Sequence, residues 1–258
     1  MGKTEIRKQS LFEWLIEKNK ISVGEISERF LISLPTARKT CALLVEEGKA
    51  IRTHGGIQRL PTSQLGYSFD MFTNENIEEK RRIGKHAASL IENNSVIFLE
   101  AGTTLLQCAI AFAERIKHKQ LQNIIVFTNS LMNLEVLHPV CSVNLIGGMY
   151  RGDQRDLIGY MSELALKDLH FDYCFVGADA ISLSSGVMAM DIDTVRFNRE
   201  LAGRSEKVVI LAHSEKLRRQ SLLSFVAIDD VSCIVTDSGL DDDLFQRYQE
   251  KDVNLIRV

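Results

Sequence analysis

The segment from residue 22 to residue 48 restricts the fold of this chain more than any other, because it carries the signals of two short helices joined by a tight turn. Ser22 and Glu25 have the spacing of a capping box, which predicts that the first helix begins there. A turn at Leu31-Ile32 should end it. The apolar residues expected to face inward from this helix are Val23, Ile26 and Phe30.

A second helix should begin at Ser33, whose hydroxyl can cap it, and end at Gly48. Pro35 fits the first turn of this helix, where a missing amide hydrogen costs nothing. At about 100° per residue, the apolar side chains fall on one side and the hydroxyl and cationic side chains fall outward. The predicted inward residues are Ala37, Cys41, Leu44 and Val45, and the predicted outward residues are Thr36, Lys39 and, on the flank, Arg38.

The residues that follow predict a basic hairpin. From residue 50 to residue 60, apolar and polar residues alternate around a turn at Gly55-Gly56. Two helices and a basic hairpin suit a DNA groove, where side chains read base edges and grip phosphates. A small helical unit with a solvated charged face is the alternative, and the hairpin argues against it. The residues predicted to contact double-stranded operator DNA are Ser33, Pro35, Thr36, Arg38, Lys39, Arg52 and His54, and Arg59 also lies on the hairpin.

The charges of the chain are divided unevenly between its two parts. Residues 1–60 contain 11 lysines and arginines against 7 acidic residues, and the remaining residues contain 20 against 27, although the whole chain carries a net charge of −3. The cations are therefore concentrated in the segment with the helix pair. Because so small an excess attracts DNA only weakly, we expect a homo-oligomer that multiplies it.

The cysteines indicate a reducing compartment, since they are five in number, far apart and embedded in apolar runs. The sequence has no Cys-x-x-Cys pair and no histidine cluster, so we expect neither a metal site nor a cofactor. It also has no signal-peptide pattern and no apolar run of the roughly 18 residues that a membrane span needs. We therefore expect a cytoplasmic protein without a membrane partner.

A turn-rich segment at residues 60–66 predicts a domain boundary. We place a DNA-binding domain at residues 1–60, a linker at 61–74 and a second domain at 75–258. Apolar runs alternate with helical stretches in the second domain, which is typical of an α/β fold with a largely parallel sheet. The predicted strands are residues 95–99, 123–127, 143–146, 173–176, 208–211 and 233–236, and the predicted helices lie near 78–91, 104–118, 162–169, 194–204 and 241–250.

Small polar loops follow these strands, at the edge where parallel sheets bind ligands. The loop at residues 100–104 leads directly into a helix, so it suits a phosphate, although ordinary turn and cap roles explain it equally well. Arg151 could bind a phosphate and Asp179 could bind sugar hydroxyls. The candidate effector-binding residues are Gly102, Thr103, Thr104, Asn129, Ser130, Gly147, Gly148, Arg151, Asp179 and Lys216.

These motifs together resemble the DeoR family of bacterial sugar-operon regulators over nearly the whole chain. The resemblance rests on residues 26–30, 32–33, 36–39, 52–56, 102–104, 128–130, 147–148, 171–172 and 177–179 and on Lys216. It implies a winged helix-turn-helix, a sensor domain with a fold related to ribose-5-phosphate isomerase, and a phosphorylated sugar or polyol as effector. The chain departs from the family pattern at Thr40 and Cys41, where we expect an effect on operator preference, and at Ala180 and His213, where we expect an effect on effector identity.

The leading interpretation is a repressor of a carbohydrate-utilisation operon, without enzyme activity. A sugar-phosphate isomerase with an accessory domain is the alternative, because Glu100, Asp179 and Lys216 could supply a base and a cation. The run after residue 179 lacks the carboxylate and lysine residues of the related isomerases, which argues against it. An activator is a third possibility, since the sign of regulation depends on where the operator lies.

Overall fold

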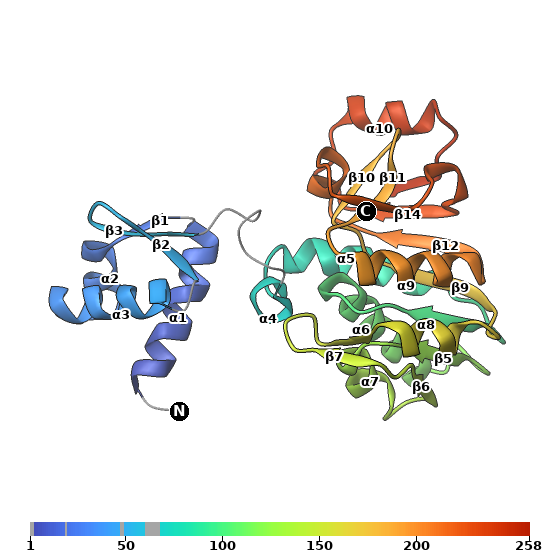
Figure 1. Cartoon of the computed structure of the whole chain (residues 1–258), viewed down its shortest axis with the longest axis horizontal. Helices are drawn as coiled ribbons and strands as arrows, with labels where there is room; N and C mark the ends of the chain where they lie inside the picture. Colours follow the sequence, from blue (N-terminus) through green and yellow to red (C-terminus); the bar gives the residue numbers. More distant parts are fainter. Residues whose placement is uncertain (1–2, 19, 47–48, 60–67) are drawn as a thin grey trace. The chain divides into compact units, whose positions relative to one another are not determined.

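The computed structural model describes residues 3–18, 20–46, 49–59 and 68–258 (Figure 1). It contains two compact units, Met1–Glu75 and Asn76–Val258, and each has hydrophobic clusters of its own. The predicted linker at residues 61–74 lies partly outside the described residues, and its described part contains the short helix α4 (Phe69–Phe72). The linker therefore stays a prediction.

The first unit is a winged helix-turn-helix, as its sequence predicts. Buried apolar residues from three helices form its core, and Ile21 and Ile57 from an antiparallel sheet pack into that core. The sheet has the strand order β1-β3-β2, so a third strand joins the predicted hairpin. The elements are α1 (Lys3–Lys18), β1 (Lys20–Ser22), α2 (Val23–Arg29), α3 (Leu34–Glu46), β2 (Ala50–Thr53) and β3 (Gly56–Arg59).

The start of α2 confirms the predicted capping box. The Glu25 amide donates to Ser22 Oγ at 3.2 Å, and the Ser22 amide donates to Glu25 Oε2 at 2.8 Å. At the start of α3, Ser33 Oγ accepts a longer hydrogen bond of 3.4 Å from the Thr36 amide. The predicted end of α3 at Gly48 lies outside the described residues.

The hairpin turn lies one residue earlier than the sequence predicts. His54 and Gly55 form the turn, and Thr53 pairs with Gly56. The φ of Gly55 is +89°, a conformation that favours glycine. Gly56 is a strand residue, and a Cβ atom on it would lie 2.1 Å from the carbonyl oxygen of Ile21. The neighbouring strand therefore requires the second glycine, and that contact is not local in the sequence.

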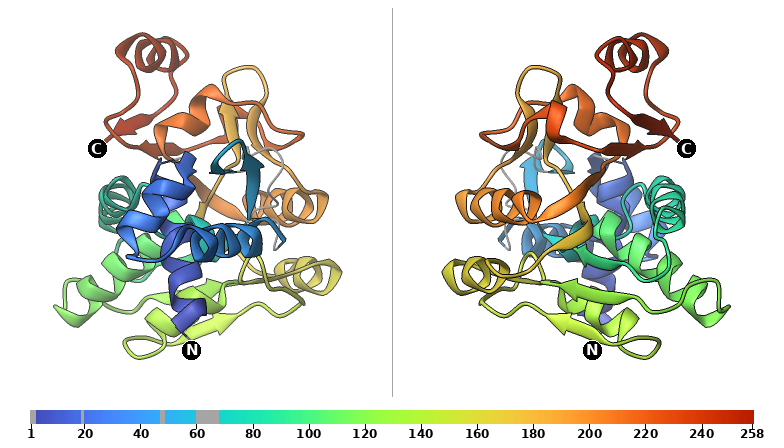
Figure 2. Two further views of the ribbon diagram at one scale, coloured as in Figure 1. Left: turned by 90° about the vertical axis from the view of Figure 1, so that its left-hand side faces the viewer. Right: turned by 90° about the vertical axis from the view of Figure 1, so that its right-hand side faces the viewer.

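A seven-stranded parallel sheet organises the second unit, which confirms the predicted α/β class. Its strand order is β15-β14-β12-β9-β4-β5-β6. Figure 2 shows α5 and α6 on one side of this sheet and α8 and α9 on the other, and each side has its own apolar cluster. The strands are β4 (Val96–Leu99), β5 (Ile125–Thr128), β6 (Val143–Leu145), β9 (Phe171–Val176), β12 (Ser205–Leu211), β14 (Cys233–Thr236) and β15 (Leu255–Arg257), and the helices are α5 (Ile77–Ser89), α6 (Thr103–Lys117), α7 (Leu131–Leu137), α8 (Tyr160–Leu166), α9 (Ile192–Gly203) and α10 (Asp242–Gln249).

Two smaller antiparallel sheets in this unit are absent from the sequence prediction. One is the hairpin of β7 (Met149–Arg151) and β8 (Asp156–Ile158), which follows β6. The other contains β10 (Ala180–Ser182), β11 (Gly186–Ala189) and β13 (Leu223–Val226). In the described ranges, no helix is long and apolar enough to cross a membrane.

Candidate nucleic-acid interface and effector site

A hollow of about 470 Å³ in the first unit brings three predicted DNA-contacting residues together. Arg38 reaches it from α3, Arg52 from β2 and His54 from the hairpin turn. None of the three forms an ion pair within the described ranges, so their donors are available to a partner. The lining residues are Val23, Gly24, Leu34, Arg38, Arg52, Thr53, His54 and Gly55.

Two other cations of this unit, Lys18 and Arg29, have partners within it. The guanidinium of Arg29 lies 4.5 Å from the ring centroid of Trp14, and the Lys18 ammonium lies 5.4 Å from it. Lys18 also pairs with Glu25 at 3.1 Å. Arg38 and Arg52, by contrast, bring two guanidinium groups without an ion pair in the described ranges into one hollow.

The other predicted contacts lie at the exposed start of α3. The hydroxyls of Ser33 and Thr36 are 2.9 Å apart, and Pro35 and Lys39 are exposed. None of these four lines the hollow, so their contact with DNA stays a prediction.

Thr40 and Cys41, where the chain departs from the family pattern, are both buried, and the burial of Cys41 agrees with its predicted inward position. Their exposed fractions are 2% and 0%, and Thr40 Oγ1 donates to the carbonyl of Thr36 at 3.0 Å. Burial raises the pKa of the Cys41 thiol. A buried side chain does not reach a base edge directly, so an effect of these two residues on operator preference would act through the packing of α3 and stays a prediction.

In the second unit, parallel pairing brings the carboxyl ends of β4, β5, β9 and β12 to one edge of the sheet. Hydrogen bonds join the loops there. Asn129 Oδ1 accepts from the Ala101 amide at 3.0 Å, and Glu100 Oε2 accepts from the Gly177 amide at 2.8 Å. Gly102, with φ +151°, is the residue before α6, and Thr103 and Thr104 are that helix's first two residues. The structure thus places three of the predicted loops side by side.

Buried amides lie beneath these loops. Ser130 Oγ caps α7 by accepting from the Asn133 amide at 3.2 Å, and Asn133 Nδ2 donates to the Glu100 carbonyl at 2.9 Å. Asn129 Nδ2 is buried and has no hydrogen-bond partner among the described residues. Because an unpaired buried donor is costly, it is the group at this edge that would gain most from an acceptor.

The two glycines after β6 differ in what requires them. A Cβ on Gly148 would lie 2.1 Å from Ser162 Oγ and 2.7 Å from the carbonyl oxygen of Ile158, so packing against α8 explains this glycine. A Cβ on Gly147 would meet nothing within 4 Å. Open space at Gly147 is compatible with a ligand that approaches the backbone there.

Arg151 has partners that the sequence prediction did not include. Its guanidinium donates to both carboxylate oxygens of Asp156, at 2.9 and 2.5 Å, to Asp191 at 3.0 Å and to Thr194 at 3.1 Å. These bonds tie the β7–β8 hairpin to the start of α9. These bonds support an anchoring role for Arg151, and its contact with a phosphate stays a prediction.

Asp179 and Lys216 come together across two loops. Lys216 Nζ lies 3.9 Å from Asp179 Oδ1, and Asp179 Oδ2 accepts from the Met190 amide at 2.8 Å. Beside them, burial together with the charges of Lys216 and the buried Lys80 lowers the pKa of His213 to about 4. Burial of Lys80 has no signal in the sequence, because a lysine on an amphipathic helix usually faces water.

Glu100 is the buried carboxyl group at the centre of this edge. Its two oxygens accept from the Gly177 amide and from Asn198 Nδ2, each at 2.8 Å. Burial raises its pKa to about 7, against the lowering effect of these hydrogen bonds. Since both oxygens accept hydrogen bonds, Glu100 links its own loop to the loop after β9 and to α9.

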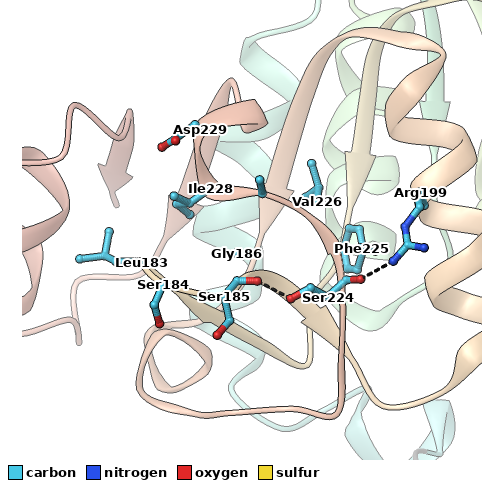
Figure 3. Close-up of a pocket in the computed structure, with 11 residues that line it drawn as sticks. Leu183, Ser184, Ser185, Gly186, Arg199, Ser224, Phe225, Val226, Ile228 and Asp229 are labelled. Carbon is cyan, nitrogen blue, oxygen red and sulfur yellow. Dashed lines mark hydrogen bonds between the residues drawn. The ribbon is translucent and has the colours of Figure 1, made fainter.

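A pocket of about 370 Å³ lies elsewhere in the second unit, between β11, β13 and α9 (Figure 3). Arg199 lines it and donates to the carbonyl of Ser224 at 2.8 Å. None of the predicted effector-binding residues lines this pocket. The predicted residues lie instead in segments that follow the carboxyl ends of β4, β5, β6, β9 and β12.

Comparison with known proteins identifies relatives along most of the chain. Residues 7–63 match the model of the DeoR-like helix-turn-helix domain, and residues 75–238 match that of the DeoR C terminal sensor domain. The HTH-type transcriptional regulator GolR of Listeria innocua is 29% identical over 95% of this chain and 94% of its own length. A putative aga operon transcriptional repressor of Escherichia coli O157:H7 is 28% identical over 99% and 94%.

Solved structures give a weaker similarity. A D-ribose-5-phosphate isomerase in complex with phospho-erythronic acid aligns with a TM-score of 0.42 and 18% identity, over 55% of this chain and 54% of that one. The relatives with full-length matches are named as DNA-binding regulators, and the isomerase alternative is therefore not favoured.

Proposed function

Because the chain belongs to the DeoR family of transcriptional regulators, we propose that it represses a carbohydrate-utilisation operon and that a phosphorylated sugar or polyol controls its binding to operator DNA. The observation that carries the proposal is the hollow of the first unit, where Arg38, Arg52 and His54 converge without ion-pair partners among the described residues.

The hollow suits a DNA backbone that passes between α3 and the hairpin. Guanidinium groups bind phosphate oxygens with paired N–H donors, and contacts of this kind fix the register of a protein on the duplex. With Arg38 on α3 and Arg52 on β2, a phosphate in the hollow would be held from both sides. The exposed start of α3 would then face the base edges.

The sheet edge of the second unit supports the effector half of the proposal. The amides at the start of α6, the donor of Asn129 and the ammonium of Lys216 offer hydrogen bonds and positive charge to a phosphate. Asp179, close to Lys216, offers acceptors to sugar hydroxyls. We propose that nine of the ten predicted residues contact the effector. The tenth, Arg151, supports the site from the β7–β8 hairpin.

Gel-shift titration with DNA from the neighbourhood of the chain's own gene tests the DNA half. We expect a complex that survives competitor DNA and weakens steeply as salt rises. A panel of sugar phosphates, polyol phosphates and inorganic phosphate, added to the complex and to the free protein in a thermal-shift assay, tests the effector half. Binding that is indifferent to DNA sequence would overturn the proposed repressor function. A thermal shift with inorganic phosphate alone would overturn the proposal that the effector is a phosphorylated sugar or polyol.

A further inference from the structure

Leu34 is an apolar residue in a place where the fold does not bury it. It is the first residue of α3, its exposed fraction is 48%, and it lines the hollow with Arg38, Arg52 and His54. Full burial of a leucine side chain stabilises a protein by roughly 1.5–3 kcal/mol. The half-exposed Leu34 contributes only part of this free energy to folding. A leucine among three basic side chains is better explained by a partner that is both charged and locally apolar.

The start of α3 holds Leu34 in a defined position. The hydroxyls of Ser33 and Thr36 are hydrogen-bonded at 2.9 Å, and Ala37, on the inward side, is fully buried. Leu34 and Arg38 are four residues apart, so their side chains lie on one face of the helix. A contact made by Leu34 is therefore fixed relative to a phosphate held by Arg38.

DNA provides an apolar group at that position. Thymine displays its 5-methyl group in the major groove, where the first residues of a recognition helix meet the base edges. We propose that Leu34 selects a thymine in the operator by packing against this methyl group, while Arg38 and Arg52 hold the flanking phosphates. The inference rests on the proposed DNA-binding function and adds to it a residue that determines specificity.

Replacement of thymine by deoxyuridine in the operator tests the contact, because it removes the methyl group and keeps the base pair. Each thymine of the operator found by gel shift is replaced singly, and the dissociation constant is measured at one salt concentration. For the wild-type chain we expect at least one position where the replacement weakens binding about fourfold, the value of one buried methyl-sized group.

The Leu34→Ala chain should bind the thymine operator more weakly and should show no loss at that same position. Leu34→Met keeps the volume and the apolar character, so it should retain the preference for thymine. Leu31→Ala is the matched control, because Leu31 has an exposed fraction of 92%, precedes α3 and does not line the hollow. It should keep the wild-type response to deoxyuridine.

Three outcomes are decisive. A coupling between Leu34 and one thymine methyl group supports the inference. If deoxyuridine weakens binding equally in the wild-type and Leu34→Ala chains, or in neither, the inference is wrong. The proposed repressor function would still stand, since the sequence-specific complex still forms. Failure of every fragment to give such a complex overturns the proposed function itself. Melting temperatures of the variants identify any loss of folding.

Discussion

At the scale of single residues, Glu100 makes the stability of the second unit depend on pH. Its pKa is about 7 in the folded chain and about 4.5 when unfolded, so the folded chain binds the proton more tightly and stability falls as pH rises from about 4.5 to 7. We expect Glu100→Gln to exceed the wild type in unfolding free energy at pH 8, by on the order of 3 kcal/mol, and the difference to become small near pH 4, below the unfolded pKa. Urea unfolding at both pH values measures this difference.

The amide of the substituted side chain can keep both hydrogen bonds of the site. Its oxygen can accept from Gly177, and its nitrogen can donate to Asn198 Oδ1, which is buried without a partner among the described residues, if the Asn198 amide is rotated. His213 has a lowered pKa in the folded chain, so the free energy of unfolding falls as pH falls below 6.5. The Glu100→Gln substitution leaves this effect of His213 in place. A variant that is less stable than the wild type at pH 8 would contradict the assigned pKa.

Arg38 should matter for DNA and not for the fold, because it is exposed and unpaired within the described ranges. We expect Arg38→Ala to weaken operator binding about tenfold and to lower the slope of log affinity against log salt by about 1. The effector-induced thermal shift should be unchanged. Gel shifts at several salt concentrations measure both quantities, and simultaneous loss of DNA binding and of the effector shift would point to misfolding.

At the scale of elements, the sequence predicted the features that depend on residues close together in the chain. The capping box at Ser22, the six apolar strands and the polar loops at one sheet edge are all in the structure, because helix caps and buried parallel strands have their own residue signatures. Elements that depend on distant partners were missed. The β7–β8 hairpin is held by bonds from Arg151 to Asp191, and Gly56 is required by β1, and neither contact has a local signal.

The β7–β8 hairpin gives an element-scale prediction that separates two roles of Arg151. If Arg151 anchors the hairpin to α9, Arg151→Met leaves Asp156, whose side chain is 5% exposed, without its counterion. We expect a loss of about 2–4 kcal/mol in unfolding free energy, somewhat below the range for a fully buried pair because Arg151 is partly exposed. Urea unfolding measures it.

The double variant Arg151→Met with Asp156→Asn is the control, since it removes the unpaired charge as well. We expect it to recover part of the lost stability. A single variant as stable as the wild type that no longer responds to any sugar phosphate would show that Arg151 contacts the effector directly, as the sequence alone suggested.

At the scale of the whole molecule, two units with separate cores need a thermodynamic link to act as a switch. If the effector lowers operator affinity by some factor, operator DNA must lower effector affinity by the same factor. We expect that factor to be about 5–150, as is usual for coupled sites. Calorimetric titration with the sugar phosphate that gives the largest thermal shift, in the presence and absence of saturating operator DNA, measures one side of the relation, and gel shifts measure the other.

The Arg38→Ala chain tests whether the change in effector affinity requires bound DNA. Titrated with effector at an operator concentration too low to saturate it, this variant should show the effector affinity of the DNA-free protein, because coupling requires DNA to be bound. With enough operator to saturate the variant, the wild-type factor should return. Equal effector affinities in the free and DNA-saturated wild-type protein would mean that the second unit binds a ligand without controlling the first, and the regulatory half of the proposed function would then be wrong.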